Sequence, residues 1–83
     1  MTESYSDYEV KILLDLFNAK GLINQAISCS ERAHHAVQRV RITAYGSPLR
    51  ETVDPLAELT DKLTSLAEEI FGKLDEAFKE ARA

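Results

Sequence analysis

The fold is decided by residues 6–45, which read SDYEVKILLDLFNAKGLINQAISCSERAHHAVQRVRITAY. Apolar residues recur in this stretch in alternating steps of four and three, interrupted only by a serine. The positions are Ile12, Leu16, Ala19, Ile23, Ala26, Ser30, Ala33, Val37, Val40 and Ala44. Because an α-helix has 3.6 residues per turn, this spacing keeps one helix face apolar. The stretch therefore predicts one long amphipathic helix over about residues 6–45.

Both ends of this helix carry sequence signals. Ser6 and Glu9 have the spacing of a capping box, in which each side chain binds the backbone N–H of the other residue. At the other end, Gly46 suits the left-handed conformation that ends many helices, and Pro48 cannot continue the helical hydrogen bonds. These signals place the helix boundaries near residues 6 and 45.

Gly21 leaves two alternatives open for the first helix. It has the character of a C-terminal helix cap, which predicts a turn at Gly21 and a monomeric three-helix bundle. In the other alternative the helix continues through Gly21 at a cost of about 1 kcal/mol. The apolar spacing keeps its phase across Gly21, which favours a continuous helix.

A second helix is predicted over about residues 54–82, after a loop at residues 46–53. Asp54 is a good N-cap, and Pro55 suits the first helical position. The apolar stripe of this helix consists of Leu56, Leu59, Leu63, Leu66, Ile70, Leu74, Phe78 and Ala81. The sequence thus predicts an all-α protein whose 83 residues form a single helical domain, 1–83.

An antiparallel hairpin of these two helices leaves one apolar segment without a partner. If the helices fold back across the 46–53 loop, the numbers of facing residues add up to about 100, and residues 10–17 overhang. Burying a large aliphatic side chain contributes about 1.5–3 kcal/mol, so a soluble protein is expected to cover this segment. The sequence therefore predicts a hairpin that assembles as a dimeric helical bundle, with the three-helix bundle as the alternative.

The expected interface lies on the overhang and on the C-terminal half of the second helix. Its residues are Val10, Leu13, Leu14, Phe17, Ile70, Phe71, Leu74 and Phe78. We predict a non-enzymatic protein–protein interaction module of the adaptor, inhibitor or anti-activator type. Its expected partners are a second copy of the chain, as a homodimer, and another protein.

A basic patch supports an alternative function, a small nucleic-acid-binding regulator. The patch contains Arg32, His35, Arg39, Arg41 and Arg50. Arginine forms bidentate contacts with phosphate and with carboxylate, so the patch suits either nucleic acid or an acidic partner surface. The acidic pI of about 5.1 and the lack of helix-turn-helix spacing place nucleic acid second.

Catalysis, metal and cofactor binding are not expected. Cys29, Glu31, His34 and His35 are close in sequence, but only Glu31 and His35 share a helix face cleanly. We find no phosphate-binding glycine loop and no nucleophile motif. The sequence therefore predicts no catalytic residue, no metal ligand and no cofactor site.

The sequence predicts a cytoplasmic protein that does not bind membranes. Cys29 is the single cysteine, which fits a reducing compartment, and the polar N-terminus does not resemble a signal peptide. No apolar run approaches the roughly 20 residues that span a bilayer. The most amphipathic predicted helix, at 54–83, is acidic on its polar face, which is opposite to what anionic lipid surfaces attract.

Overall fold

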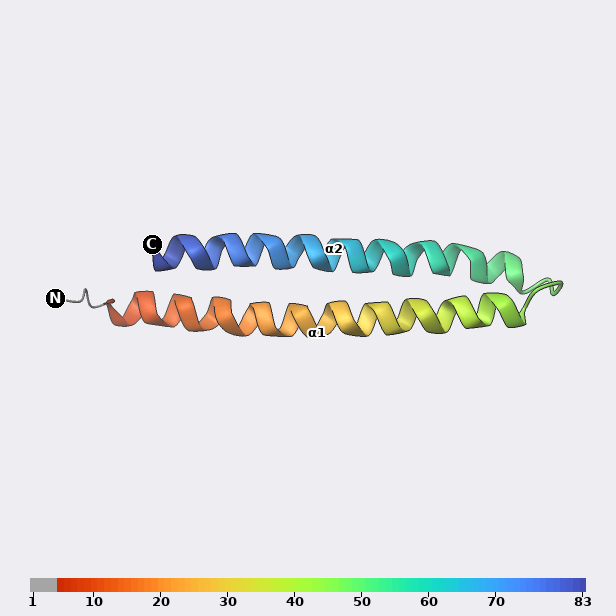
Figure 1. Ribbon diagram of the computed structural model, residues 1–83, viewed down its shortest axis with the longest axis horizontal. Coiled ribbons are helices and arrows are strands. Elements are labelled where there is room, and N and C mark those ends of the chain that lie inside the picture. The colour runs from red at the N-terminus through yellow and green to blue at the C-terminus, as the bar shows by residue number, and fades with distance from the viewer. Residues whose placement is uncertain (1–4) are drawn as a thin grey trace.

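The chain forms an antiparallel helical hairpin, which confirms the predicted all-helical fold. The computed structural model describes residues 5–83. Helix α1 spans Asp7–Thr43 and helix α2 spans Arg50–Arg82. The two helices lie side by side, with the first turn of α1 extending beyond the end of α2, and form a rod of 69 × 17 × 14 Å (Figure 1). The hairpin is therefore long and thin.

The start of α1 is fixed by the predicted capping box. The Glu9 backbone N–H donates to Ser6 Oγ at 3.1 Å, and the Ser6 N–H donates to Glu9 Oε1 at 3.2 Å. Just before this cap, the Tyr5 hydroxyl donates to the backbone carbonyl of Arg82 at 2.8 Å. The Tyr5 hydrogen bond ties the residues just before α1 to the last turn of α2.

Helix α1 passes through Gly21 without a break. The chain therefore does not turn at this residue, and the alternative three-helix bundle is not the observed fold. A Cβ atom built on Gly21 would meet nothing within 4 Å, so the glycine is not required by close packing.

The connection between the helices is shorter than predicted. Gly46 has a φ of +83°, the left-handed conformation expected at the end of α1. Helix α2 then begins at Arg50, four residues before the predicted start near Asp54. Asp54 does not cap the helix, because its carboxylate accepts a 2.9 Å hydrogen bond from Arg41 Nε on α1.

The early start of α2 changes which residues face each other. Ser30 lies against Thr64, and Lys20 contacts Asp75, so the numbers of facing residues add up to 94 or 95 instead of about 100. The last turns of α2 consequently reach the first turns of α1. The predicted overhang of residues 10–17 is therefore shortened, because α2 runs beside residues 13–17.

Neither helix in residues 5–83 contains a segment with the length and apolar character needed to cross a membrane.

Candidate interaction surface

The helices meet along an inner seam of small and half-buried side chains. On α1 the seam consists of Leu13, Leu16, Lys20, Ile23, Ile27, Ser30, His34, Val37, Arg41 and Ala44. On α2 it consists of Val53, Ala57, Thr60, Thr64, Ala67, Phe71, Leu74, Phe78 and Ala81. Ser30, Ala57 and Ala67 are the most buried residues of the described chain, at 5–7% exposure. Within residues 5–83, no large side chain is completely buried in this seam.

The seam is rotated relative to the stripe predicted on α1. Seven of the ten predicted positions, such as Ile23 and Val37, are buried or half-buried, whereas Ala26, Ala33 and Val40 lie exposed beside the seam. Polar residues such as His34 take part in the seam instead. The rotation is possible because these polar side chains find partners on α2.

A chain of hydrogen bonds crosses the seam in the half nearest the loop. The Thr60 hydroxyl donates to the Ala57 carbonyl, so it accepts from Nδ1 of His34 at 2.8 Å. Nε2 of His34 lies 3.3 Å from the amide nitrogen of Gln38. The Gln38 amide oxygen accepts from Arg41 at 2.8 Å, and Arg41 also binds Asp54. This chain links the two helices through side chains with defined geometry.

A second polar contact closes the seam at the other end of the hairpin. Lys20 Nζ donates to Asp75 at 2.7 Å and lies 4.8 Å from the centroid of the Phe78 ring. The Lys20 hydrogen bond, followed by that of Lys79, lowers the pKa of the Asp75 carboxyl below its ordinary value. The rings of Phe17 and Phe78 are 6.4 Å apart beside this pair. The ion pair and the aromatic contact hold the terminal turns together.

The residues predicted as the interface fall into two groups. Leu13, Phe71, Leu74 and Phe78 lie in the inner seam and face the other helix of the same chain. The remaining four are more open, with exposed fractions of 39–64%. These residues are Val10, Leu14, Phe17 and Ile70.

A long exposed apolar feature is a leucine face on α2, formed by Leu56, Leu59, Leu63, Leu66 and Ile70. Their exposed fractions lie between 39 and 57%. The sequence placed these residues against α1, but in the structure they lie beside the inner seam. Their alternating steps of three and four are typical of residues that pack against a further helix. Except for Ile70, the predicted interface did not include them.

An alanine row on α1, formed by Ala26, Ala33 and Ala36, continues this surface. Ala33 precedes the seam residue His34, just as Leu63 precedes the seam residue Thr64. In an antiparallel helix pair these equivalent positions fall on the same flank of the seam. The three alanines are exposed, as is Val40 further along α1 at 50%. One flank of the hairpin therefore carries large side chains on α2 and small ones on α1.

An apolar groove extends this flank towards the loop. Its lining includes Ala36, Val40, Ala44 and Leu49. Leu49 is 66% exposed, although it is a large aliphatic residue. The groove joins the alanine row to the connection between the helices.

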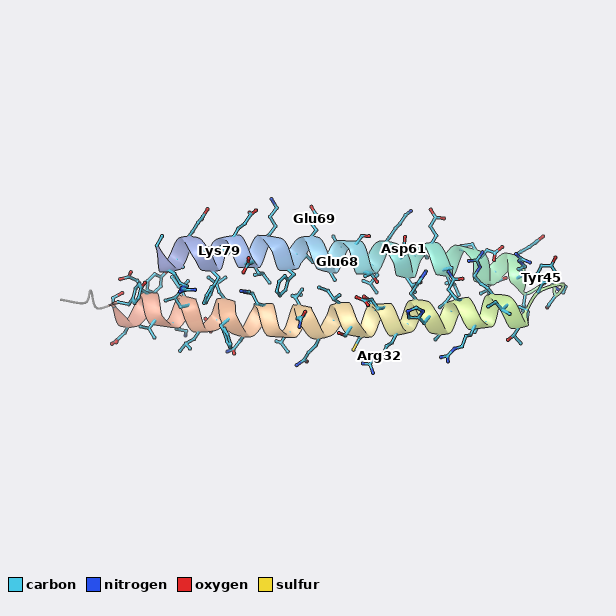
Figure 2. The ribbon with its side chains drawn as sticks, viewed as in Figure 1. Arg32, Tyr45, Asp61, Glu68, Glu69 and Lys79 are labelled. Atoms are coloured by element: carbon cyan, nitrogen blue, oxygen red, sulfur yellow. The ribbon has the colours of Figure 1, made fainter. Side chains whose placement is uncertain are left out.

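The basic patch is only partly assembled. Arg32, His35 and Arg39 line a shallow depression on the outer side of α1, and Figure 2 shows Arg32 pointing away from α2. Arg41 is directed into the inner seam, where it binds Asp54. Arg50 approaches the same carboxylate at 3.7 Å and lies over the Tyr45 ring at 4.6 Å. The structure therefore separates Arg41 and Arg50 from the other three residues.

The cysteine and histidines do not form a common site. Cys29 is exposed, and its sulfur accepts a hydrogen bond from Arg32 at 3.3 Å. His34 is engaged in the inner seam, whereas His35 faces outward. Across residues 5–83, no three His, Cys, Asp or Glu side chains are grouped so that they could hold a metal ion.

In comparisons with protein families, with curated proteins and with solved structures, nothing matches this chain.

Proposed function

We propose that the protein is a non-enzymatic helical interaction module of the adaptor, inhibitor or anti-activator type. The observation that supports this proposal is the exposed leucine face of α2. Contiguous exposed apolar surface commonly marks a site for protein partners. The module acts in the cytoplasm as a dimer of hairpins, and its apolar helix faces bind a protein partner.

Nucleic-acid binding remains a weaker candidate. It now draws on Arg32, His35 and Arg39, since Arg41 and Arg50 both approach Asp54. Binding through phosphate contacts strengthens with the number of free cations, so the two arginines Arg32 and Arg39 offer a small electrostatic contribution. The same three residues suit an acidic protein surface equally well.

Photo-cross-linking in cells that express the chain tests the proposed function. A benzophenone amino acid at position 63 lies on the leucine face, and the same group at position 61 lies on the opposite flank of the seam. We expect a cross-linked protein adduct from position 63, whether the partner is a second copy or another protein. The matched variant at exposed Asp61 controls for random collisions. Equal yields at both positions, or no adduct at either, would contradict an interaction through this face.

A further inference from the structure

We propose that the leucine face and the alanine row together form a dimer interface whose partner is a second copy of this chain. This inference rests on the proposed function and identifies its surface and its occupant. The leucine face comprises Leu56, Leu59, Leu63, Leu66 and Ile70. The alanine row lies on the same flank of the hairpin, on α1.

The inner seam contains few well-buried side chains. Its most buried members are a serine and two alanines, and two of its central contacts join polar groups. Ser30 and Thr64 meet at 2.9 Å through their hydroxyl groups. The large apolar members of the seam, such as Leu16 and Leu74, are only half-buried, so the seam aligns the two helices but leaves part of their apolar surface in water. The large aliphatic residues of α2 need a second contact.

The single hairpin also has a larger accessible surface than a compact monomer of the same mass. The chain exposes 6609 Å², whereas a compact monomer of 9.3 kDa exposes about 5,000 Å². The excess of about 1,600 Å² per chain matches obligate dimers, which bury roughly 2,000–5,000 Å² over both partners. A second hairpin placed along the rod therefore covers an area of the right size.

The composition of the leucine face and the alanine row also fits a homodimer interface. Neither the leucine face nor the alanine row contains a charged residue, and homodimer interfaces are more apolar than other interfaces. A two-fold axis brings both rows of both chains into one core, where large and small side chains interdigitate. One chain thus carries all the parts that a symmetric four-helix bundle requires.

Cys29 provides an internal reporter of this interface. It lies on α1 between Ala26 and Ala33, at helix spacings of three and four residues. Its thiol is exposed in the single hairpin. In the proposed dimer the second chain covers the thiol, so its reaction with a disulfide reagent slows as the protein concentration rises.

The test combines light scattering with thiol reactivity on the purified chain across a dilution series. We expect a dimer with a protected Cys29. Leu63→Asp is expected to weaken dimerisation at least about 100-fold and to release the thiol. Ile42→Asp is the matched control, because Ile42 is 76% exposed on another face of α1 and its substitution should change neither property. Leu66→Gln, which keeps helix propensity, provides a second variant if Leu63→Asp unfolds.

Two results would overturn the inference. The first is a folded wild-type monomer at all concentrations; an adduct from position 63 in cells would then show that another protein, and not a second copy, binds the leucine face. The second is a dimer that neither Leu63→Asp nor Leu66→Gln weakens, which would place the contact elsewhere. A dimer that Leu63→Asp weakens, together with only the dimer adduct from position 63 in cells, would support the inference and contradict the binding of another protein at this face.

Discussion

Individual polar side chains align the two helices of this hairpin. His34, Gln38 and Arg41 on α1 reach Thr60 and Asp54 on α2 through distances of 2.8–3.3 Å. A shift of one helix along the other would leave these groups without partners, and an unsatisfied polar group costs about 1–3 kcal/mol when buried. The polar seam residues therefore favour a single register, whereas apolar contacts alone would tolerate several.

Asp75 makes the stability of the hairpin depend on pH. Its pKa is lowered in the folded state, chiefly by Lys20, so its ion pair stabilises the fold above about pH 4 and is lost as the pH falls through the lowered pKa. We expect the free energy of unfolding of the wild type to fall more steeply between about pH 5 and 2 than that of Asp75→Asn. Urea unfolding across this range measures the difference, which is modest because the Asp75 side chain is 32% exposed.

Glu76→Gln is the matched control for this prediction. Glu76 is an exposed neighbour that forms no ion pair among the described residues, so its loss removes a carboxylate without removing a contact. Its stability profile should follow that of the wild type. Identical profiles for the wild type and Asp75→Asn would show that the pair with Lys20 does not contribute to stability.

At the scale of the helices, two glycines lower the stability without a structural role. Gly21 and Gly72 lie inside α1 and α2, and a Cβ atom on either would meet nothing within 4 Å. We expect Gly21→Ala and Gly72→Ala each to raise the free energy of unfolding by about 0.5–1 kcal/mol, since alanine is favoured over glycine in a helix. Chemical denaturation monitored by circular dichroism measures the change.

Gly46→Ala is the control, because it is expected to change the free energy of unfolding in the opposite direction. The φ of +83° at Gly46 is unfavourable for alanine, so this substitution should destabilise the hairpin. A loss of stability on Gly21→Ala would mean that α1 bends or breaks at Gly21 in solution, contrary to the continuous helix.

The sequence predicted the helices well because their signals are local. The capping box at Ser6 and the left-handed Gly46 act within a few residues, and both were found as expected. The start of α2 was not predicted, since Asp54 and Pro55 together are typical of a helix start. In the structure Asp54 binds Arg41 on the other helix, a contact that no local pattern encodes.

The apolar stripe of α2 predicted only in part which of its residues face α1. The steps from Leu56 to Leu66 alternate between three and four, whereas the steps from Leu66 to Phe78 are all four. Each step of four advances the stripe by about 40° around the helix. The predicted stripe therefore starts on the leucine face and ends in the inner seam. This change of spacing was the signal that two separate surfaces were present.

The candidate site was harder to predict because it depends on the register. Arg32 and Arg41 look equivalent in the sequence, yet only Arg41 has a carboxylate across the seam. Likewise, Leu63 and Leu74 belong to one predicted stripe, but Leu63 lies outside the seam and Leu74 within it. A start of α2 four residues earlier than predicted was enough to exchange the facing partners.

At the scale of the whole molecule, the residues that align the two helices are not the residues that carry the large exposed apolar side chains. The inner seam sets the register through small and polar residues, and the leucine face carries large side chains that the hairpin does not cover. A two-helix hairpin of this size has little core of its own, and small chains commonly gain stability by oligomerisation. We therefore expect folding and dimerisation to be one coupled process.

The most direct measurement of this claim is the thermal unfolding midpoint of the wild-type chain over a wide range of protein concentrations. If the leucine face is buried by a second copy, the midpoint rises with concentration, because dimerisation stabilises the folded state by mass action. Leu63→Asp should lower the midpoint and remove this dependence. A wild-type midpoint that stays constant across the range would contradict the account and show that the hairpin is stable with its leucine face exposed.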